Sequence, residues 1–114
     1  MRRYLKKFPH AIRGLHYALR HDFGFRAQIY IAFITIVLVL VFLSPLQVTE
    51  FLFLSLAAVL VFITELQNSA IEAALDRLHP ERHESIMRSK DMAAAAVLLA
   101  GCFALLVLVT VALF

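Results

Sequence analysis

The sequence predicts an all-α membrane protein with three transmembrane helices and an N-terminal amphipathic surface helix. Of its 114 residues, 62% are hydrophobic and 17% are charged, whereas soluble domains average about 45–50% and about 25%. A soluble monomer of this size buries only about 60–70% of its chain surface, so it cannot hide this much apolar area. The single cysteine, Cys102, excludes an intrachain disulfide framework and a zinc site built from cysteines.

The segment ahead of the first apolar block, at about 9–24, is expected to form the surface helix, with Pro9 in its first turn. Ile12 and Leu15 recur at helical spacing, and Arg13 lies on the other side. A basic amphipathic helix suits a membrane interface with anionic headgroups. The alternative is a segment that only anchors the chain and fixes its topology.

Three apolar blocks determine the expected spans, because a transmembrane helix needs roughly 20 residues. We expect spans at about 26–43, about 47–66 and about 92–114, with the second helix continuing into the cytoplasm to about residue 76. The sequence contains no internal repeat and no low-complexity linker. Residues 1–114 are therefore expected to form a single domain.

The positive charges indicate the orientation of these spans. Most of the 11 Lys and Arg residues precede the first span, and the others lie between the second and third. By the positive-inside rule, the N-terminus and the second loop are expected in the cytoplasm, and the C-terminus outside. The formal net charge of +3 is thus interpreted as a topology signal. We expect no nucleic acid partner, because no basic groove with interleaved aromatic residues accompanies it.

Polar side chains collect on one helix face where the second span reaches the cytoplasm. At about 100° per residue they share an arc of about 100°, which holds Glu65, Asn68, Ser69, Glu72 and Asp76. Glu65 lies at or inside the membrane boundary, and a charge at mid-bilayer costs about 2.5–3.5 kcal/mol. We therefore expect it to face a polar interior. The alternative is an ordinary solvated helix face that pairs with Arg77, Arg82 and Lys90.

Stacked carboxylates repel one another unless a cation lies among them, and Mg²⁺ prefers carboxylate oxygens together with substrate phosphates. Arg88 and Lys90 precede the third span, and Asp22 and Arg26 precede the first. Carboxylates combined with Lys and Arg are the groups that phosphoryl transfer requires. This combination favours a hypothesis in which ATP phosphorylates a lipid alcohol at the cytoplasmic boundary of the membrane.

A longer pattern carries a family resemblance. It runs from Glu65 through Asn-Ser-Ala-Ile-Glu to Asp76, and continues with His83-Glu84 and with Lys90-Asp-Met-Ala-Ala-Ala-Ala-Val. This pattern resembles the prokaryotic diacylglycerol kinase family, which includes the kinases for diacylglycerol and for undecaprenol. The resemblance covers nearly the whole chain and implies three membrane helices, an amphipathic N-terminal helix and a homotrimer.

The resemblance also implies roles for individual residues. Glu65 matches the catalytic base that deprotonates the lipid hydroxyl, while Glu72 and Asp22 match metal-binding carboxylates. The residues that match the surroundings of the nucleotide are Asn68, Lys90, Asp91, His83, Glu81, Arg82 and Arg3. Those expected to be structural or close to the substrate are Arg26, Ser69 and Asp76. Asp22 departs from the family's Glu and is shorter by one methylene.

The expected function is ATP- and Mg²⁺-dependent transfer of the γ-phosphoryl group to diacylglycerol. It is expected in the cytoplasmic (inner) membrane of a bacterium, with the active site facing the cytoplasm. Undecaprenol remains the alternative acceptor, although Phe25-Arg26 is similar to the diacylglycerol enzymes. Alternatives from other classes are an ion- or proton-coupled transporter that uses Glu65 as its carrier carboxylate, and a non-catalytic membrane scaffold. Three helices cannot enclose both ATP and a lipid, so we expect sites shared between subunits.

Overall fold

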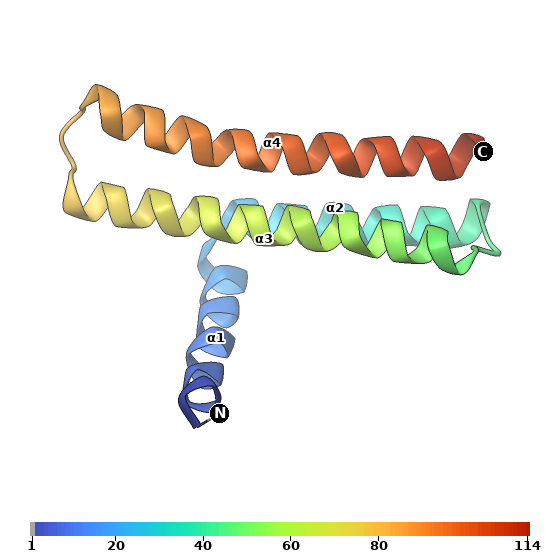
Figure 1. The fold of residues 1–114 in the computed structure, drawn as a ribbon, viewed down its shortest axis with the longest axis horizontal. Helices are drawn as coiled ribbons and strands as arrows, with labels where there is room; N and C mark the ends of the chain where they lie inside the picture. Colours follow the sequence, from blue (N-terminus) through green and yellow to red (C-terminus); the bar gives the residue numbers. More distant parts are fainter. Residues whose placement is uncertain (1) are drawn as a thin grey trace.

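Four helices make up the computed structural model, which describes residues 2–114. They are α1 (Arg2–His21), α2 (Phe23–Phe42), α3 (Val48–Leu78) and α4 (Glu84–Leu113). The last three run side by side, and α1 leaves them at a steep angle (Figure 1). Helices α2, α3 and α4 are each long and apolar enough to cross a membrane. The expected all-α architecture with three such helices is therefore confirmed.

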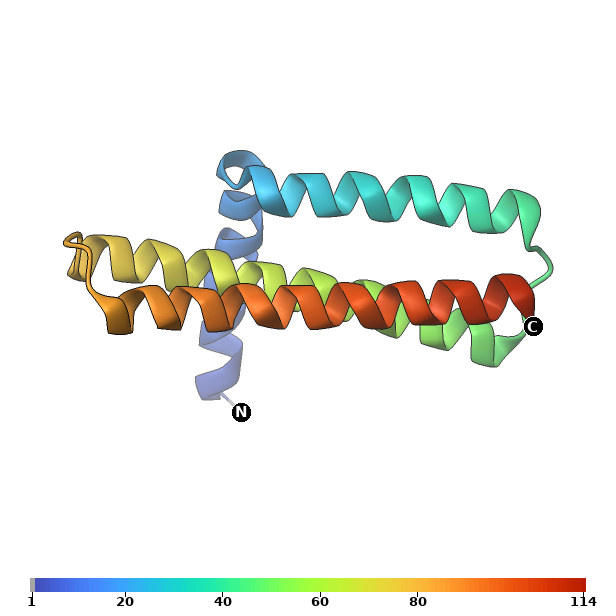
Figure 2. The ribbon, with the colours of Figure 1, turned by 90° about the horizontal axis from the view of Figure 1, so that it is seen from above.

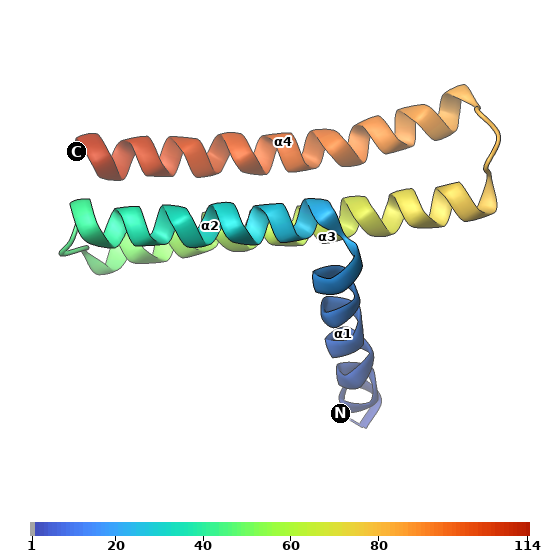
Figure 3. The same cartoon turned by 180° about the vertical axis from the view of Figure 1, so that it is seen from behind.

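Helix α3 is central to the bundle, because it packs against both α2 and α4. Seen from above, α2 runs alongside the α3–α4 pair (Figure 2). The 31 residues of α3 correspond to about 46 Å of helix, whereas the hydrocarbon core of a bilayer is about 30 Å thick. Both α3 and α4 continue past the start of α2 (Figure 3). One end of this pair therefore projects beyond the bilayer core.

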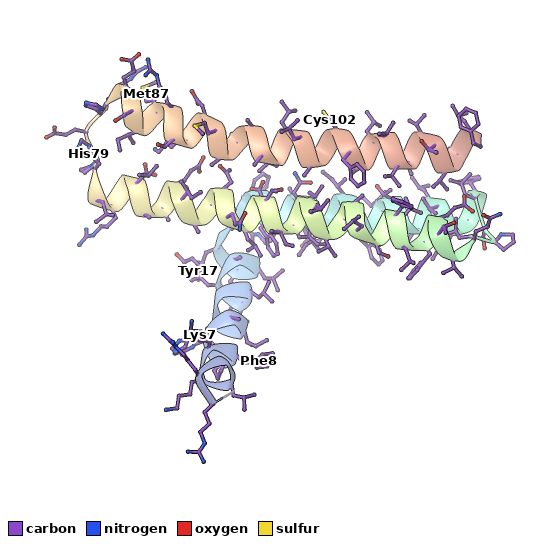
Figure 4. The ribbon with its side chains drawn as sticks, viewed as in Figure 1. Lys7, Phe8, Tyr17, His79, Met87 and Cys102 are labelled. Carbon is purple, nitrogen blue, oxygen red and sulfur yellow. The ribbon has the colours of Figure 1, made fainter. Side chains whose placement is uncertain are left out.

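Helix α1 has separate apolar and basic faces. Its apolar stripe consists of Leu5, Phe8, Ile12, Leu15 and Leu19, which are all exposed. Figure 4 shows Phe8 on the side of α1 toward which α2 extends, and Lys7 on the opposite side. This separation of apolar and basic faces is typical of a helix that lies at a membrane interface.

The expected bounds of the surface helix are wrong at both ends. Helix α1 already begins at Arg2, so Pro9 lies inside it and does not open it. A proline inside a helix removes one backbone hydrogen bond, but the apolar periodicity continues N-terminally through Phe8 and Leu5. At the other end α1 stops at His21, because Asp22 adopts an extended conformation with φ −102° and ψ 104°.

Capping residues also explain why two helices begin before the spans that hydropathy predicts. Asp22 caps α2, which starts at Phe23 and not near residue 26. His83 caps α4 by accepting a hydrogen bond from the Ser85 amide, so α4 starts at Glu84 and not near residue 92. Residues 84–91 of α4 are mostly polar, and Arg26 interrupts the apolar pattern at the start of α2. Hydropathy therefore misses these turns, although their backbone is helical. The start of α3 lies within one residue of its expected position, and its end lies two residues later.

Few side chains are buried within the chain, and they are mostly small. The buried residues are Ala18, Phe25, Val39, Ala57, Ala100 and Val107. Small residues let membrane helices approach closely, and many large apolar side chains remain exposed along α2, α3 and α4, as suits a lipid environment. Among the side chains that the structure describes, Phe25 is the one large residue that is buried, at 3% exposure. Its ring meets Phe62 edge-on at a centroid distance of 6.1 Å, which joins the start of α2 to α3.

Replacing Phe25 with Ala is expected to lower the free energy of unfolding by about 3 kcal/mol, because it leaves a cavity at the α2–α3 contact. The matched control is Phe42→Ala on the same helix, where the ring is 74% exposed. Thermal unfolding of both variants in the same detergent measures the difference. Equal unfolding temperatures for the two variants would contradict this account of the contact.

Candidate active site

The corner between α1 and α2 is built around Asp22. One oxygen of its half-buried carboxylate, Oδ1, accepts a hydrogen bond from the Phe25 amide at 3.3 Å and so caps α2. The other oxygen, Oδ2, is buried and accepts no hydrogen bond within residues 2–114. A buried carboxylate oxygen without a donor is costly. This oxygen is therefore available to a cation or to a hydrogen-bond donor supplied by a ligand.

The half-buried carboxylate of Glu65 reaches this corner from α3. A Cβ placed on Gly24 would overlap the Glu65 Oε1 atom and would lie 3.4 Å from Asp22 Oδ1. Glu65 therefore lies against the first turn of α2, close to Asp22. Amides in a first turn lack intrahelical partners, and the helix dipole makes this end positive. That environment offsets part of the repulsion between the two carboxylates.

The remaining polar stripe continues along α3 away from the bilayer core. Asn68 and Ser69 are half-buried, and Glu72 and Asp76 are exposed. The Oδ1 atom of Asn68 is buried and accepts no hydrogen bond within the described chain. Glu65 lies close to Asp22, and Glu72 follows about two turns later on the same face of α3. The structure thus brings together a group of acids, with an amide beside Glu65 on the same helix face.

Lys90 joins the start of α4 to this stripe, because its ammonium group forms an ion pair with Asp76. Lys90 is half-buried, whereas the neighbouring Asp91 is exposed. Arg26 is half-buried in the first turns of α2. The ion pair therefore places one cation at the end of the carboxylate stripe that lies farthest from Glu65.

The other residues predicted near a nucleotide lie apart from Glu65. Glu81 and Arg82 lie in the turn between α3 and α4, where Arg82 Nε donates to Met87 Sδ at 3.3 Å. His83 caps α4, and its ring lies 6.0 Å from that of His79 between centroids. Figure 4 shows this turn at the far end of the α3–α4 pair. Arg3 is exposed near the free end of α1, so one chain does not gather all the predicted nucleotide residues.

An apolar groove of about 440 Å³ runs between α2, α3 and α4. Its lining reaches Gln28 on α2 and Phe62 on α3. Phe62 lies three residues before Glu65 on the same helix, which is about one turn. The acid group and the apolar groove therefore adjoin one another along α3.

Comparison with known proteins identifies the family of this chain. The prokaryotic diacylglycerol kinase profile matches residues 9–112. The chain belongs to this family. It is 38% identical over 98 residues to a diacylglycerol kinase of Escherichia coli, an alignment that covers 86% of this chain and 79% of the relative. It is 37% identical over 93 residues to a diacylglycerol kinase of Haemophilus influenzae, covering 82% and 77%.

A relative with a different name is almost as similar. The chain is 34% identical over 97 residues to an undecaprenol kinase of Bacillus subtilis, which covers 85% of this chain and 77% of the relative. Membership of the prokaryotic diacylglycerol kinase family makes the chain a lipid kinase by class, and the expected family is confirmed. The family contains enzymes named for two different lipid alcohols, so membership alone does not select the acceptor.

The carboxylates at the site of this diacylglycerol kinase family member are of the kind that bind a magnesium ion. No group of three or more His, Cys, Asp or Glu residues within 2–114 has the geometry to hold a metal unaided. Mg²⁺ is commonly held by one or two carboxylates together with substrate phosphates. Asp22 Oδ2 is a buried, unpartnered oxygen ligand of the kind such an ion requires. The residues present therefore fit a metal that arrives with a nucleotide.

Gly24 is a site residue that the sequence reasoning missed. It is an isolated glycine without a motif around it, so neither composition nor spacing indicated it. The available signal was its place two residues after the Asp22 cap. Gly24 matters because the first turn of α2 contacts α3 at Glu65, and this contact exists only in the folded protein.

The ion pair between Lys90 and Asp76 is expected to add little to stability. The Asp76 side chain is 64% exposed and that of Lys90 is 34% exposed, and pairs in water contribute about 0–1 kcal/mol. Asp76→Asn should therefore change the free energy of unfolding by less than about 1 kcal/mol. Thermal unfolding compared with Phe25→Ala measures this change. A loss as large as that of Phe25→Ala would show that the pair holds α3 and α4 together.

Proposed function

We propose that the protein is an ATP- and Mg²⁺-dependent kinase that transfers the γ-phosphoryl group of ATP to the hydroxyl of diacylglycerol and forms phosphatidic acid. The observation that carries this proposal is the position of Glu65, half-buried against the start of α2 beside Asp22. A carboxylate at this depth adjoins both the apolar groove and the polar ends of α3 and α4. A lipid alcohol and a soluble phosphate donor therefore have access to the same group.

Glu65 acts in this proposal as the general base. It accepts the proton of the lipid hydroxyl as that oxygen bonds to the γ-phosphorus, and the bond from phosphorus to the bridging oxygen breaks to release ADP. Positioning and electrostatics dominate phosphoryl transfer. The half-buried setting suits this role, because it holds the base beside its acceptor and limits access by water.

Glu72 and Asp22 would hold the metal in this proposal. Bound Mg²⁺ would neutralise charge on the phosphates of the nucleotide. Asn68 lies on the helix face between Glu65 and Glu72, and its unpartnered Oδ1 suits a ligand in this group. The further residues proposed to contact or order the nucleotide are Lys90, Asp91, His83, Glu81, Arg82 and Arg3. Arg26, Ser69 and Asp76 would support the site from its margin.

A shared site in a homotrimer is part of the same proposal. Arg3 lies near the free end of α1, and the turn that contains His83 lies at the far end of the α3–α4 pair (Figure 1). These residues surround one nucleotide only if different subunits contribute them. The trimer accounts for this separation without a rearrangement of the helices.

Undecaprenol is the second candidate acceptor, because a relative of this name is 34% identical to the chain. Diacylglycerol is favoured because the chain is 37–38% identical to relatives named for that lipid. The transporter and scaffold alternatives are disfavoured, since the relatives are named kinases. The protein is proposed to reside in the cytoplasmic membrane with the site on the cytoplasmic side.

Substituting Glu65 by Gln is expected to lower kcat at least about 100-fold, because an amide cannot accept the proton. Glu72→Gln is expected to impair activity with a raised requirement for Mg²⁺. The control is Glu50→Gln at the other end of α3, where Gln can still accept the hydrogen bond from the Gln47 amide. Transfer of label from ATP to lipid in mixed micelles measures all three variants.

The same assay distinguishes the acceptors. Diacylglycerol should give a higher kcat/KM than undecaprenol, and chelation should abolish transfer until Mg²⁺ is restored. A higher value with undecaprenol would reverse the assignment of the lipid. Phosphorylation of neither lipid, or full activity in Glu65→Gln, would refute the proposed function.

The proposed orientation is tested by cysteine labelling in a Cys102→Ser background. Glu81→Cys marks the turn between α3 and α4, and Ser44→Cys marks the turn between α2 and α3. We expect a membrane-impermeant maleimide to label position 44 in spheroplasts and position 81 only in inverted vesicles. The opposite pattern would place the proposed site outside the cytoplasm.

A further inference from the structure

We infer that Gly24 is a positioning residue, whose missing side chain sets where the Glu65 carboxylate lies beside Asp22. The inference rests on the proposed role of Glu65 as the base and adds a determinant of its position. A Cβ at Gly24 would overlap Glu65 Oε1 and would come within 3.4 Å of Glu65 Cδ. The Glu65 carboxylate therefore occupies the space that any larger residue at position 24 needs.

Backbone conformation does not require a glycine at this position. Within residues 2–114, no glycine has a positive φ, and Gly24 lies in the first turn of α2. Alanine is the better helix former by about 1 kcal/mol. Gly24 is thus the less favourable residue for local structure, and its small size is what the fold uses here.

The other two glycines of the chain differ in this respect. A Cβ on Gly14 or on Gly101 would meet nothing within 4 Å. Gly14 lies in α1 and is exposed, so Gly14→Ala is a matched substitution in a helix without a neighbouring carboxylate. The close approach to a charged side chain is specific to Gly24.

The position of Gly24 also relates to the short side chain of Asp22. The added Cβ would lie 3.4 Å from Asp22 Oδ1, so the free space adjoins both carboxylates. Asp22 is held as the cap of α2 by the hydrogen bond from the Phe25 amide. The absence of a side chain at position 24 leaves the space in which the Glu65 carboxylate lies beside it.

An alanine at position 24 would displace the end of the Glu65 side chain and leave the helices in place. The overlapping atom is the terminus of a flexible side chain, so the fold accommodates the methyl group at little cost. Misplacement of a reacting group by about 1 Å can cost about 100-fold in rate. We expect Gly24→Ala to lower kcat about 10- to 100-fold with little change in the KM for ATP, since the proposed nucleotide residues are unchanged.

The experiment compares Gly24→Ala with Gly14→Ala in the labelled-ATP assay and in thermal unfolding. The expected result is a loss of kcat in Gly24→Ala alone, with an unfolding temperature at or above that of the parent. A kcat equal to that of Gly14→Ala would overturn the inference. Failure of Gly24→Ala to fold would overturn it as well, because only one side-chain terminus is expected to move.

A double-mutant cycle with Glu65→Asp distinguishes positioning from a general structural effect. Asp is one methylene shorter and withdraws from the space at position 24, so adding Gly24→Ala should then cost less than about threefold. If the loss of kcat in the double variant equals the product of the losses in the two single variants, the positioning role is overturned. Glu65→Gln separates the two proposals. If it is inactive while Gly24→Ala equals the parent, only this inference fails. If it is fully active, the proposed function fails and the inference fails with it.

Discussion

The contact between the first turn of α2 and Glu65 on α3 determines how the rest of the site is arranged. A carboxylate at the boundary of the bilayer core requires polar surroundings. The first turn of α2 supplies them through its free amides and the positive end of its dipole. The Phe25–Phe62 contact packs the same junction, so α2 begins beside Glu65. The same junction therefore packs two aromatic rings together and provides polar surroundings for the Glu65 carboxylate.

The surface helix depends on that junction as well. Asp22 ends α1 and caps α2, so the chain changes direction at the residue that lies beside Glu65. In the proposed orientation the apolar face of α1 would lie toward lipid and would fix the depth of this corner relative to the interface. The hydroxyl of a diacylglycerol also lies near the interface, because its acyl chains occupy the core. The fold therefore brings the proposed base and the proposed acceptor to a similar depth without a moving part.

The sequence predicted the architecture well because apolar length and helical periodicity determine most of it. Apolar length identified the three long helices, and a spacing of about 100° per residue placed Glu65, Asn68 and Glu72 on one face. The starts of α2 and α4 could not be predicted from hydropathy, since they depend on the capping conformations of Asp22 and His83. The contact of Gly24 with Glu65 was inaccessible for another reason. It depends on where two helices meet, and no local pattern encodes that position.

The charges of the acid group indicate which form of the nucleotide the proposed site would accept. Asp22 and Glu65 bring negative charge together, and Glu72 lies about two turns further along α3. Asp22 Oδ2 and Asn68 Oδ1 accept no hydrogen bond from the described residues. A bare polyphosphate would add further negative charge and more acceptors, so these groups would repel it. A nucleotide complexed with a divalent cation brings its own positive charge, and carboxylate oxygens are the ligands that Mg²⁺ prefers. The electrostatics therefore favour entry of the metal with ATP, because Asp22 and Glu72 would hold the cation and its charge would reduce the repulsion between the carboxylates and the phosphates.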